Sequence, residues 1–273
     1  MFKRYKISLD TIESFIGDFI VDNMQTIYNS NAYKNWVRDQ YAAYGGDCLH
    51  SAIYGKDGVI KAQMFSDDQF PIQKRHVFIS HASKDADVAK VFAYILSKFG
   101  VTCFIDSMIW NNISVLQSEL DKRYCWLVKD KLFDYKKRNN STAHVHTMLS
   151  SALFEMIDAC ECCVFIESHN SEIRLNDIGG TSTFSPWIFS EINFINKIRI
   201  NPPERHKSTR TYSGGGCINE SEEFKIAYPL GSINDMEVIT YGILQELFKG
   251  DVSSDRGEQV LDKLYEICKR VYS

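Results

Sequence analysis

Polar and aromatic side chains follow three short apolar runs of this sequence, and each run predicts a β-strand. The runs are 76–80, 101–106 and 162–167, and their continuous apolar character is typical of parallel strands buried on both faces. Ligands of open α/β sheets bind at the carboxyl ends of such strands. The residues to inspect therefore follow all three runs and include Ser168, His169 and Asn170 after the third, and we place the binding residues at the first two. These candidate binding residues are Ser80, His81, Lys84, Phe104, Asp106 and Trp110.

A further candidate lies in the segment SPWIFSE, residues 185–191, which opens a predicted helix over 186–198. Trp187 and Glu191 are four residues apart, so both lie on one face of that helix, and we expect this face to point toward the same crevice. Ser185 is placed to cap the helix. The Trp187 ring suits either stacking on a nucleotide or packing against the sheet. By its residue type alone, Glu191 would be an exposed helix residue making an i, i+4 contact.

The eight cysteines show none of the paired spacing of a disulfide framework. Cys160 and Cys163 form a CxxC pair, with His144 and His146 upstream, so a zinc site has to be considered. A structural zinc needs four ligands, the chain has no second CxxC, and two histidines two positions apart on a helix point to different sides. We therefore expect no metal site, and reduced cysteines that pack at the start of a buried strand.

Strands alternate with helices from residue 75 onward, which predicts an α/β fold with a parallel sheet flanked by helices. A helix follows the first strand and ends at Gly100, the position of a C′ glycine, and 224–230 is a predicted fourth strand. Two connections, 107–142 and 199–222, are predicted long loops, and loops of this length are usually functional or mobile. Both are basic, which suits either a phosphate-bearing ligand or plain solvation. The other predicted helices are 113–124, 143–159, 186–198, 234–249 and 256–271.

The pattern of apolar residues in the first 70 positions predicts a small, mainly helical N-terminal lobe. Apolar residues from Ile12 to Ile20 follow helical spacing, which predicts a helix near 10–22, and Tyr33 to Tyr41 suggest a second one. Asp57-Gly58 is typical of a hairpin turn. The polar stretch 66–74 carries no period and is the predicted boundary. The expected organisation is thus a lobe over 1–70 and the α/β domain over 75–273.

Four segments together resemble a Toll/interleukin-1 receptor (TIR) domain over about residues 75–250. They are HVFISHASKDADVAKVFAYIL, GVTCFID, CCVFIESHNS, and SPWIFSE in place of the family's S-x-W-C-x-x-E. The Trp that follows FID in FIDSMIW is most similar to the bacterial branch, especially the TIR subunit of Thoeris antiphage systems. Three features depart from the family: Ile188 replaces a Cys, the loop after Asp106 is longer, and no clear fifth strand follows residue 250.

This resemblance implies a flavodoxin-like fold and an NADase that cleaves the bond between nicotinamide and ribose, with Glu191 as the catalytic carboxylate. NAD+ is then the substrate, and no separate cofactor is needed. Lys84 would contact a phosphate, and Asp106 would accept hydrogen bonds from the ribose hydroxyl groups. Alternatively, Asp106 only caps the next turn, and Ser83 or Asp85 only caps the helix that follows. The implied binding residues are Ser80, His81, Lys84, Phe104, Asp106, Trp110 and Trp187. The resemblance also implies a homo-oligomer built by TIR–TIR contacts, and an ADP-ribose-derived signal read by a separate effector in antiphage immunity.

The composition of the chain limits the classes of partner that it can bind. The net charge of −4 gives a field that does not attract polyanions, so we expect no nucleic-acid partner. No apolar run approaches the roughly 18 residues that span a bilayer, so we expect a cytoplasmic protein without a membrane partner. Two other functions stay open: a non-enzymatic TIR interaction module, in which Glu191 has no chemical role, and a nucleoside deoxyribosyltransferase-like enzyme, which the FISHASKD opening disfavours.

Overall fold

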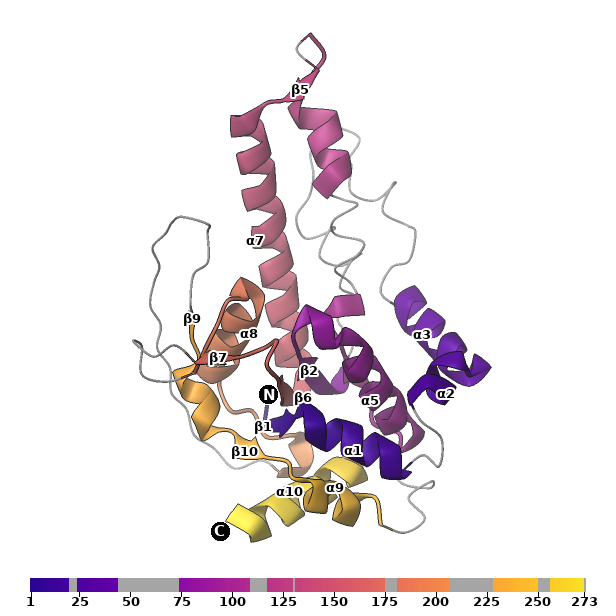
Figure 1. Ribbon diagram of the computed structural model, residues 1–273. Coiled ribbons are helices and arrows are strands. Elements are labelled where there is room, and N and C mark those ends of the chain that lie inside the picture. The colour runs from indigo at the N-terminus through magenta and orange to yellow at the C-terminus, as the bar shows by residue number, and fades with distance from the viewer. Residues whose placement is uncertain are drawn as a thin grey trace. The chain divides into compact units, whose positions relative to one another are not determined.

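In the computed structural model, five of the described strands form one parallel sheet in the order β10-β1-β6-β2-β3 (Figure 1). Their bounds are β1 Lys3–Ser8, β2 Arg75–Ser80, β3 Cys103–Phe104, β6 Cys160–Glu167 and β10 Glu237–Val238. The structure describes residues 1–19, 24–43, 74–108, 117–129, 131–174, 181–206, 228–249 and 256–272. Counted along the chain, these five strands lie in the order 5-1-4-2-3. The parallel sheet is compatible with a flavodoxin-like fold, with β1 in the place that a fourth strand takes in the order 2-1-3-4-5.

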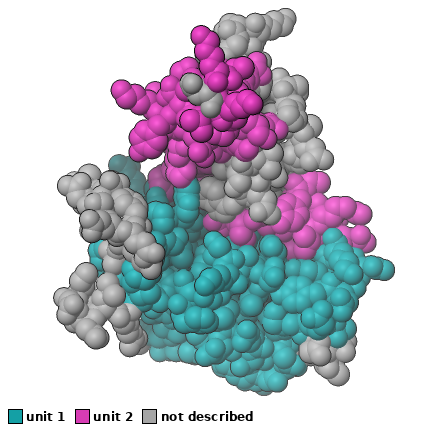
Figure 2. All heavy atoms as spheres, turned by 45° about the horizontal axis from the view of Figure 1, so that its top comes forward, with its two compact units in different colours: residues 1–34, 74–105, 157–273 teal, residues 35–73, 106–156 magenta. Residues whose placement is uncertain are grey.

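The chain divides into two compact units, coloured separately in Figure 2. Unit 1 comprises residues 1–34, 74–105 and 157–273, and it contains the parallel sheet. Unit 2 comprises residues 35–73 and 106–156. None of the described helices is both long and apolar enough to cross a membrane.

The position of β1 differs from the lobe expected over residues 1–70. β1 pairs with β6 on one side and β10 on the other, so the first residues belong to the sheet and supply a strand that the sequence analysis missed. Its cations hide this role: Lys6 Nζ bonds the Glu167 carboxylate at 2.6 Å, and Lys3 Nζ bonds Glu237 at 2.8 Å. Tyr5 and Ile7 flank Lys6 in the strand and are completely buried, so β1 is an inner strand whose charged residues are paired by its neighbours.

The helices of unit 1 follow the predicted pattern closely. α1 (Leu9–Phe19), α5 (Ala86–Lys98), α8 (Pro186–Lys197) and α10 (Gly257–Tyr272) confirm the predicted helices. Gly100 ends the α5 turn with φ 74°, a left-handed conformation that favours glycine. Gly257 is also required, because a Cβ there would lie 2.3 Å from the Gly100 carbonyl oxygen. α2 (Met24–Asn29) and α3 (Asn31–Ala43) are the remaining helices of the first 43 residues; the predicted turn at Asp57-Gly58 lies outside the described residues.

Two predictions near the carboxyl end of the chain hold only in part: a strand lies within 224–230 but not in the parallel sheet, and a helix covers only part of 234–249. The strand expected at 224–230 is β9, Tyr228–Pro229, which belongs to a small antiparallel sheet with β7 (Ile173–Arg174) and β8 (Thr181–Thr183). The helix expected at 234–249 is replaced by the 3₁₀ turn η5 (Gly231–Asp235), then β10, then α9 (Tyr241–Leu247). Thr240 starts α9, because its hydroxyl accepts a hydrogen bond from the Ile243 N–H.

Unit 2 replaces much of the long loop expected at 107–142 with ordered structure. Residues 117–120 are helical and continue into the π-helix η3 (Asp121–Cys125), and β4 (Trp126–Leu127) pairs antiparallel with β5 (Leu132–Phe133). α7 then runs from Tyr135 to Ala159 rather than starting at 143. Its first turns are polar and carry no apolar period, but Asp134 caps them by accepting the Lys137 N–H at 3.0 Å. Of the second long loop, the described part ends in the 3₁₀ turn η4 (Glu204–His206).

Candidate functional site

The candidate site lies where the order of the strands reverses. The chain passes from β2 outward to β3 and then returns to β6 on the other side of β2. Ser80 is the last residue of β2 and Glu167 the last residue of β6. The carboxyl ends of two such adjacent strands leave a crevice where α/β proteins bind their ligands. The loops after β2 and β6 are therefore the place to examine.

A buried carboxylate and a buried hydroxyl meet at this position. The Ser80 hydroxyl donates a hydrogen bond of 2.6 Å to Glu191 Oε2, and the two residues are 0% and 1% exposed. Glu191 reaches Ser80 because α8 starts where predicted: Ser185 Oγ accepts the Ile188 N–H at 3.2 Å, and Pro186 occupies the first turn. The structure thus brings together two residues that the sequence analysis named separately.

The loop after β2 is clamped to the loop after β6 by a residue that the site prediction missed. The buried Asp85 accepts hydrogen bonds from Ser168 Oγ at 2.5 Å and from Asn170 Nδ2 at 2.6 Å. The alternative of Asp85 as a plain helix cap is wrong, because its side chain makes no capping hydrogen bond to α5. The position of Asp85 at the end of S-H-A-S-K-D, directly after a predicted strand, was the sequence signal that could have identified it as a site residue. These bonds therefore tie the loop after β2 to the loop after β6.

The other residues of the first loop differ in exposure. His81 is buried, and its Nδ1–H donates to the Ile79 carbonyl at 3.2 Å. Lys84 is exposed on the 3₁₀ turn η2, Ser83–Asp85. Its ammonium is therefore accessible to an anionic group of a ligand.

Of the remaining predicted site residues, Phe104 is the one whose surroundings show a packing role. Phe104 is completely buried and stacks on Phe78 with ring centroids 5.5 Å apart, so it packs in the core. Trp187 is half-buried on α8. Asp106 is buried and belongs to unit 2, and Trp110 lies outside the described residues.

The cysteines of β6 line the sheet as neutral thiols. Burial raises the pKa of Cys163 well above its ordinary value, and the neighbouring charge of Glu191 adds to the effect. Burial likewise raises the pKa of Cys160 to about 12. Metal ligation requires thiolates, which this environment disfavours. Within the described ranges, no group of three or more His, Cys, Asp or Glu side chains is placed to hold a metal ion.

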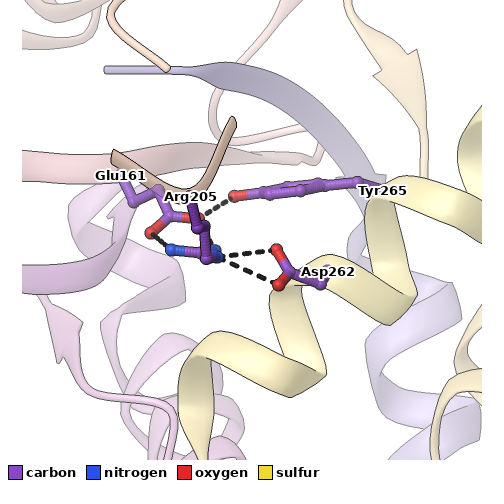
Figure 3. A network of polar contacts seen from close by, with 4 residues as sticks. All are labelled: Glu161, Arg205, Asp262 and Tyr265. Atoms are coloured by element: carbon purple, nitrogen blue, oxygen red, sulfur yellow. Dashed lines mark hydrogen bonds and ion pairs between the residues drawn. The ribbon is translucent and has the colours of Figure 1, made fainter. Parts of the chain in front are cut away.

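A second polar cluster lies at the opposite, amino end of β6 and is structural (Figure 3). Arg205 bonds both oxygens of Glu161 at 2.9 and 2.5 Å and both oxygens of Asp262 at 2.9 and 3.0 Å. The Tyr265 hydroxyl donates to Glu161 at 2.7 Å. Arg205 and Glu161 also line a cavity of about 540 Å³. Because Arg205 bonds both carboxylates, the cluster fastens η4 to β6 and α10.

The comparisons with known proteins identify no relative: no family model matches the chain, and neither a curated protein nor a solved structure is significantly similar to it.

Proposed function

We propose that this chain is a TIR-domain NAD+ glycohydrolase or cyclase that cleaves the nicotinamide–ribose bond, with Glu191 as its catalytic carboxylate. The observation that carries the proposal is the Glu191–Ser80 pair at the carboxyl end of β2, 2.6 Å apart and closed off from water. In its ionised form, a carboxylate held in a medium of low dielectric constant acts more strongly on a cation than it would in water.

The chemistry of NAD+ cleavage suits a single carboxylate. Nicotinamide leaves a pyridinium cation as a neutral base, so the reaction needs no general acid, unlike the two-carboxylate hydrolysis of glycosides. The remaining task is to stabilise the positive charge that develops on the ribose, and a preorganised carboxylate does this without reorganisation. Ser80 positions Glu191 by donating a hydrogen bond from its hydroxyl group. The exposed ammonium of Lys84 is available to bind the pyrophosphate.

The products depend on the group that captures the ribosyl cation. Water yields ADP-ribose, whereas an adenine nitrogen or a ribose hydroxyl yields a cyclic isomer. In the proposed function the product serves as a signal in antiphage immunity and acts on a separate effector. The active form is a homo-oligomer in which a neighbouring TIR domain completes the NAD+ pocket.

One observation favours a second candidate function, a non-enzymatic TIR interaction module. Glu191 is 1% exposed, and a buried carboxylate bonded to a serine can serve simply to fasten α8 to β2. The two candidates differ in one requirement: the enzyme needs NAD+ to reach Glu191, and the interaction module does not.

Incubation of the purified full chain with NAD+, followed by chromatography of nicotinamide and the adenine products, tests the proposal. We expect nicotinamide release over a range of protein concentrations, and a loss of about 10²- to 10³-fold in Glu191→Gln. Glu266→Gln, which changes an exposed glutamate of α10, is the matched control and should retain full activity. A folded Glu191→Gln protein with undiminished turnover refutes the assignment. Absence of turnover at every concentration favours the interaction module.

A further inference from the structure

The two-stranded sheet of unit 2 and its flanks expose an unusual concentration of apolar side chains. We call residues 117–138 the aromatic-basic hairpin. Ten large hydrophobic side chains are exposed among the described residues, and six of them belong to this one segment. Val128, Tyr135 and Leu132 are the most exposed, at 79%, 77% and 64%. The other three are Tyr124, Trp126 and Phe133.

The same segment is strongly basic. It contains seven Lys and Arg residues against four Asp and Glu, a net charge of +3, so the rest of the chain carries −7. All seven cations are exposed. Arg138 is neutralised by Asp121 at 2.9 Å, whereas Lys129 and Lys131, beside the turn, form no ion pair with any described carboxylate.

The hairpin is preformed. Trp126 and Phe133 lie opposite each other across β4 and β5, with ring centroids 5.0 Å apart in an edge-to-face arrangement, and the Asp134 N–H donates to the Cys125 carbonyl at 2.7 Å. Lys131 closes the turn with φ 53°. Figure 1 shows β5 beyond the amino end of α7. Binding therefore requires little ordering of this segment, which favours affinity.

We propose that the aromatic-basic hairpin docks the protein on an anionic lipid surface. Aromatic and aliphatic side chains insert at the level of the headgroups, while lysines remain at the surface and attract anionic lipids. Val128 and Leu132 lack the ring faces that stack on nucleic-acid bases. Since the remaining chain carries −7, an anionic surface repels it and selects the hairpin end.

This proposal departs from the expectation of no membrane partner, which rested on the lack of a spanning apolar run. Contact with a surface needs no such run, because a few inserted side chains and neighbouring cations suffice. The proposal is independent of NAD+ cleavage. It concerns where the protein acts rather than which bond it breaks.

Flotation with vesicles tests the proposal on the purified full chain. The vesicles contain phosphatidylcholine either alone or mixed with phosphatidylglycerol. We expect binding to the mixed vesicles, and weakening by salt because exposed charges are screened. The double variant Lys129→Gln/Lys131→Gln should weaken partitioning by about 25-fold, at about fivefold for each cation removed. Leu132→Ser should also weaken it.

The matched control is Lys269→Gln/Val271→Ser, which removes an exposed lysine and an exposed valine from α10 and should bind like the unaltered protein. Circular dichroism confirms that each variant is folded. The proposal is overturned if the protein binds neither kind of vesicle, if it binds both equally, or if the hairpin variants behave like the control. Hairpin-dependent self-association or binding to single-stranded DNA, without vesicle binding, likewise overturns it and identifies a different occupant.

Discussion

Replacement of Arg205 by methionine removes the centre of the polar cluster at the amino end of β6. The guanidinium bonds two carboxylates, Glu161 at 2.9 and 2.5 Å and Asp262 at 2.9 and 3.0 Å. Methionine keeps much of the length of the side chain but has no donor. The Glu161 side chain is 14% exposed, and after the change only the Tyr265 hydroxyl, at 2.7 Å, still donates to it among the residues of Figure 3.

The exposure of the partners sets the size of the effect. Hydrogen bonds to charged groups stabilise proteins by about 1.5–3 kcal/mol where the groups are buried, whereas exposed ion pairs contribute about 0–1 kcal/mol. Asp262 is 34% exposed, so its bonds to Arg205 contribute to stability at the level of exposed ion pairs. The more buried Glu161 accounts for most of the stabilisation. We expect Arg205→Met to cost about 2 kcal/mol, which lowers Tm by about 4–8 °C in a protein of this size. Arg205→Lys keeps the positive charge but not the two-sided geometry of the guanidinium. Its Tm should therefore lie between those of Arg205→Met and the unaltered protein.

The chain offers a matched control in Arg270, which also pairs with a glutamate. Arg270 and Glu246 are 2.5 Å apart, but their side chains are 64% and 47% exposed. Arg270→Met should therefore cost no more than about 0.5 kcal/mol. Differential scanning calorimetry of the three variants and the unaltered protein measures these shifts. If Arg205→Met lowers Tm no further than Arg270→Met does, burial does not strengthen the cluster, and the reasoning is refuted.

Three more predictions follow from buried polar groups. Ser80→Ala leaves the Glu191 carboxylate without its serine donor and should cost about 1.5–3 kcal/mol in urea denaturation; a loss below about 0.5 kcal/mol contradicts this. Burial lowers the pKa of His76, whose Nδ1 accepts the Thr102 N–H at 3.0 Å. The unfolded chain therefore protonates first, and stability should fall as the pH drops below about 6.5, a dependence that His76→Gln should flatten. Cys160, with its pKa raised to about 12, should resist iodoacetamide at about pH 8 until the protein unfolds; mass spectrometry of native and unfolded samples measures this.

Local patterns in the sequence were enough to predict the elements that position the site. The apolar run at 76–80 is β2, and the spacing of apolar residues after it gives α5, which ends at the predicted Gly100. The same holds for α8, whose start is encoded by a capping serine and a proline within a few residues. Such signals are local, because strand burial, helix periodicity and capping depend on neighbours in sequence. The types of residue at the carboxyl end of β2 were therefore known before the structure.

Contacts between distant parts of the chain, which the sequence does not reveal, bring these residues together. Ser80 and Glu191 are separated by 111 positions, and Asp85 finds its partners in the loop after β6, so no local pattern records either contact. The same reason explains β1: Lys3 and Lys6 make the strand look like a polar terminus until carboxylates on neighbouring strands pair with them. Local patterns were sufficient for β2, α5 and α8 and for the types of residue at the end of β2. The order of the strands in the sheet and the pairing of charges between strands depend on residues far apart in the sequence. The same long-range packing brings the Glu191 carboxylate to Ser80.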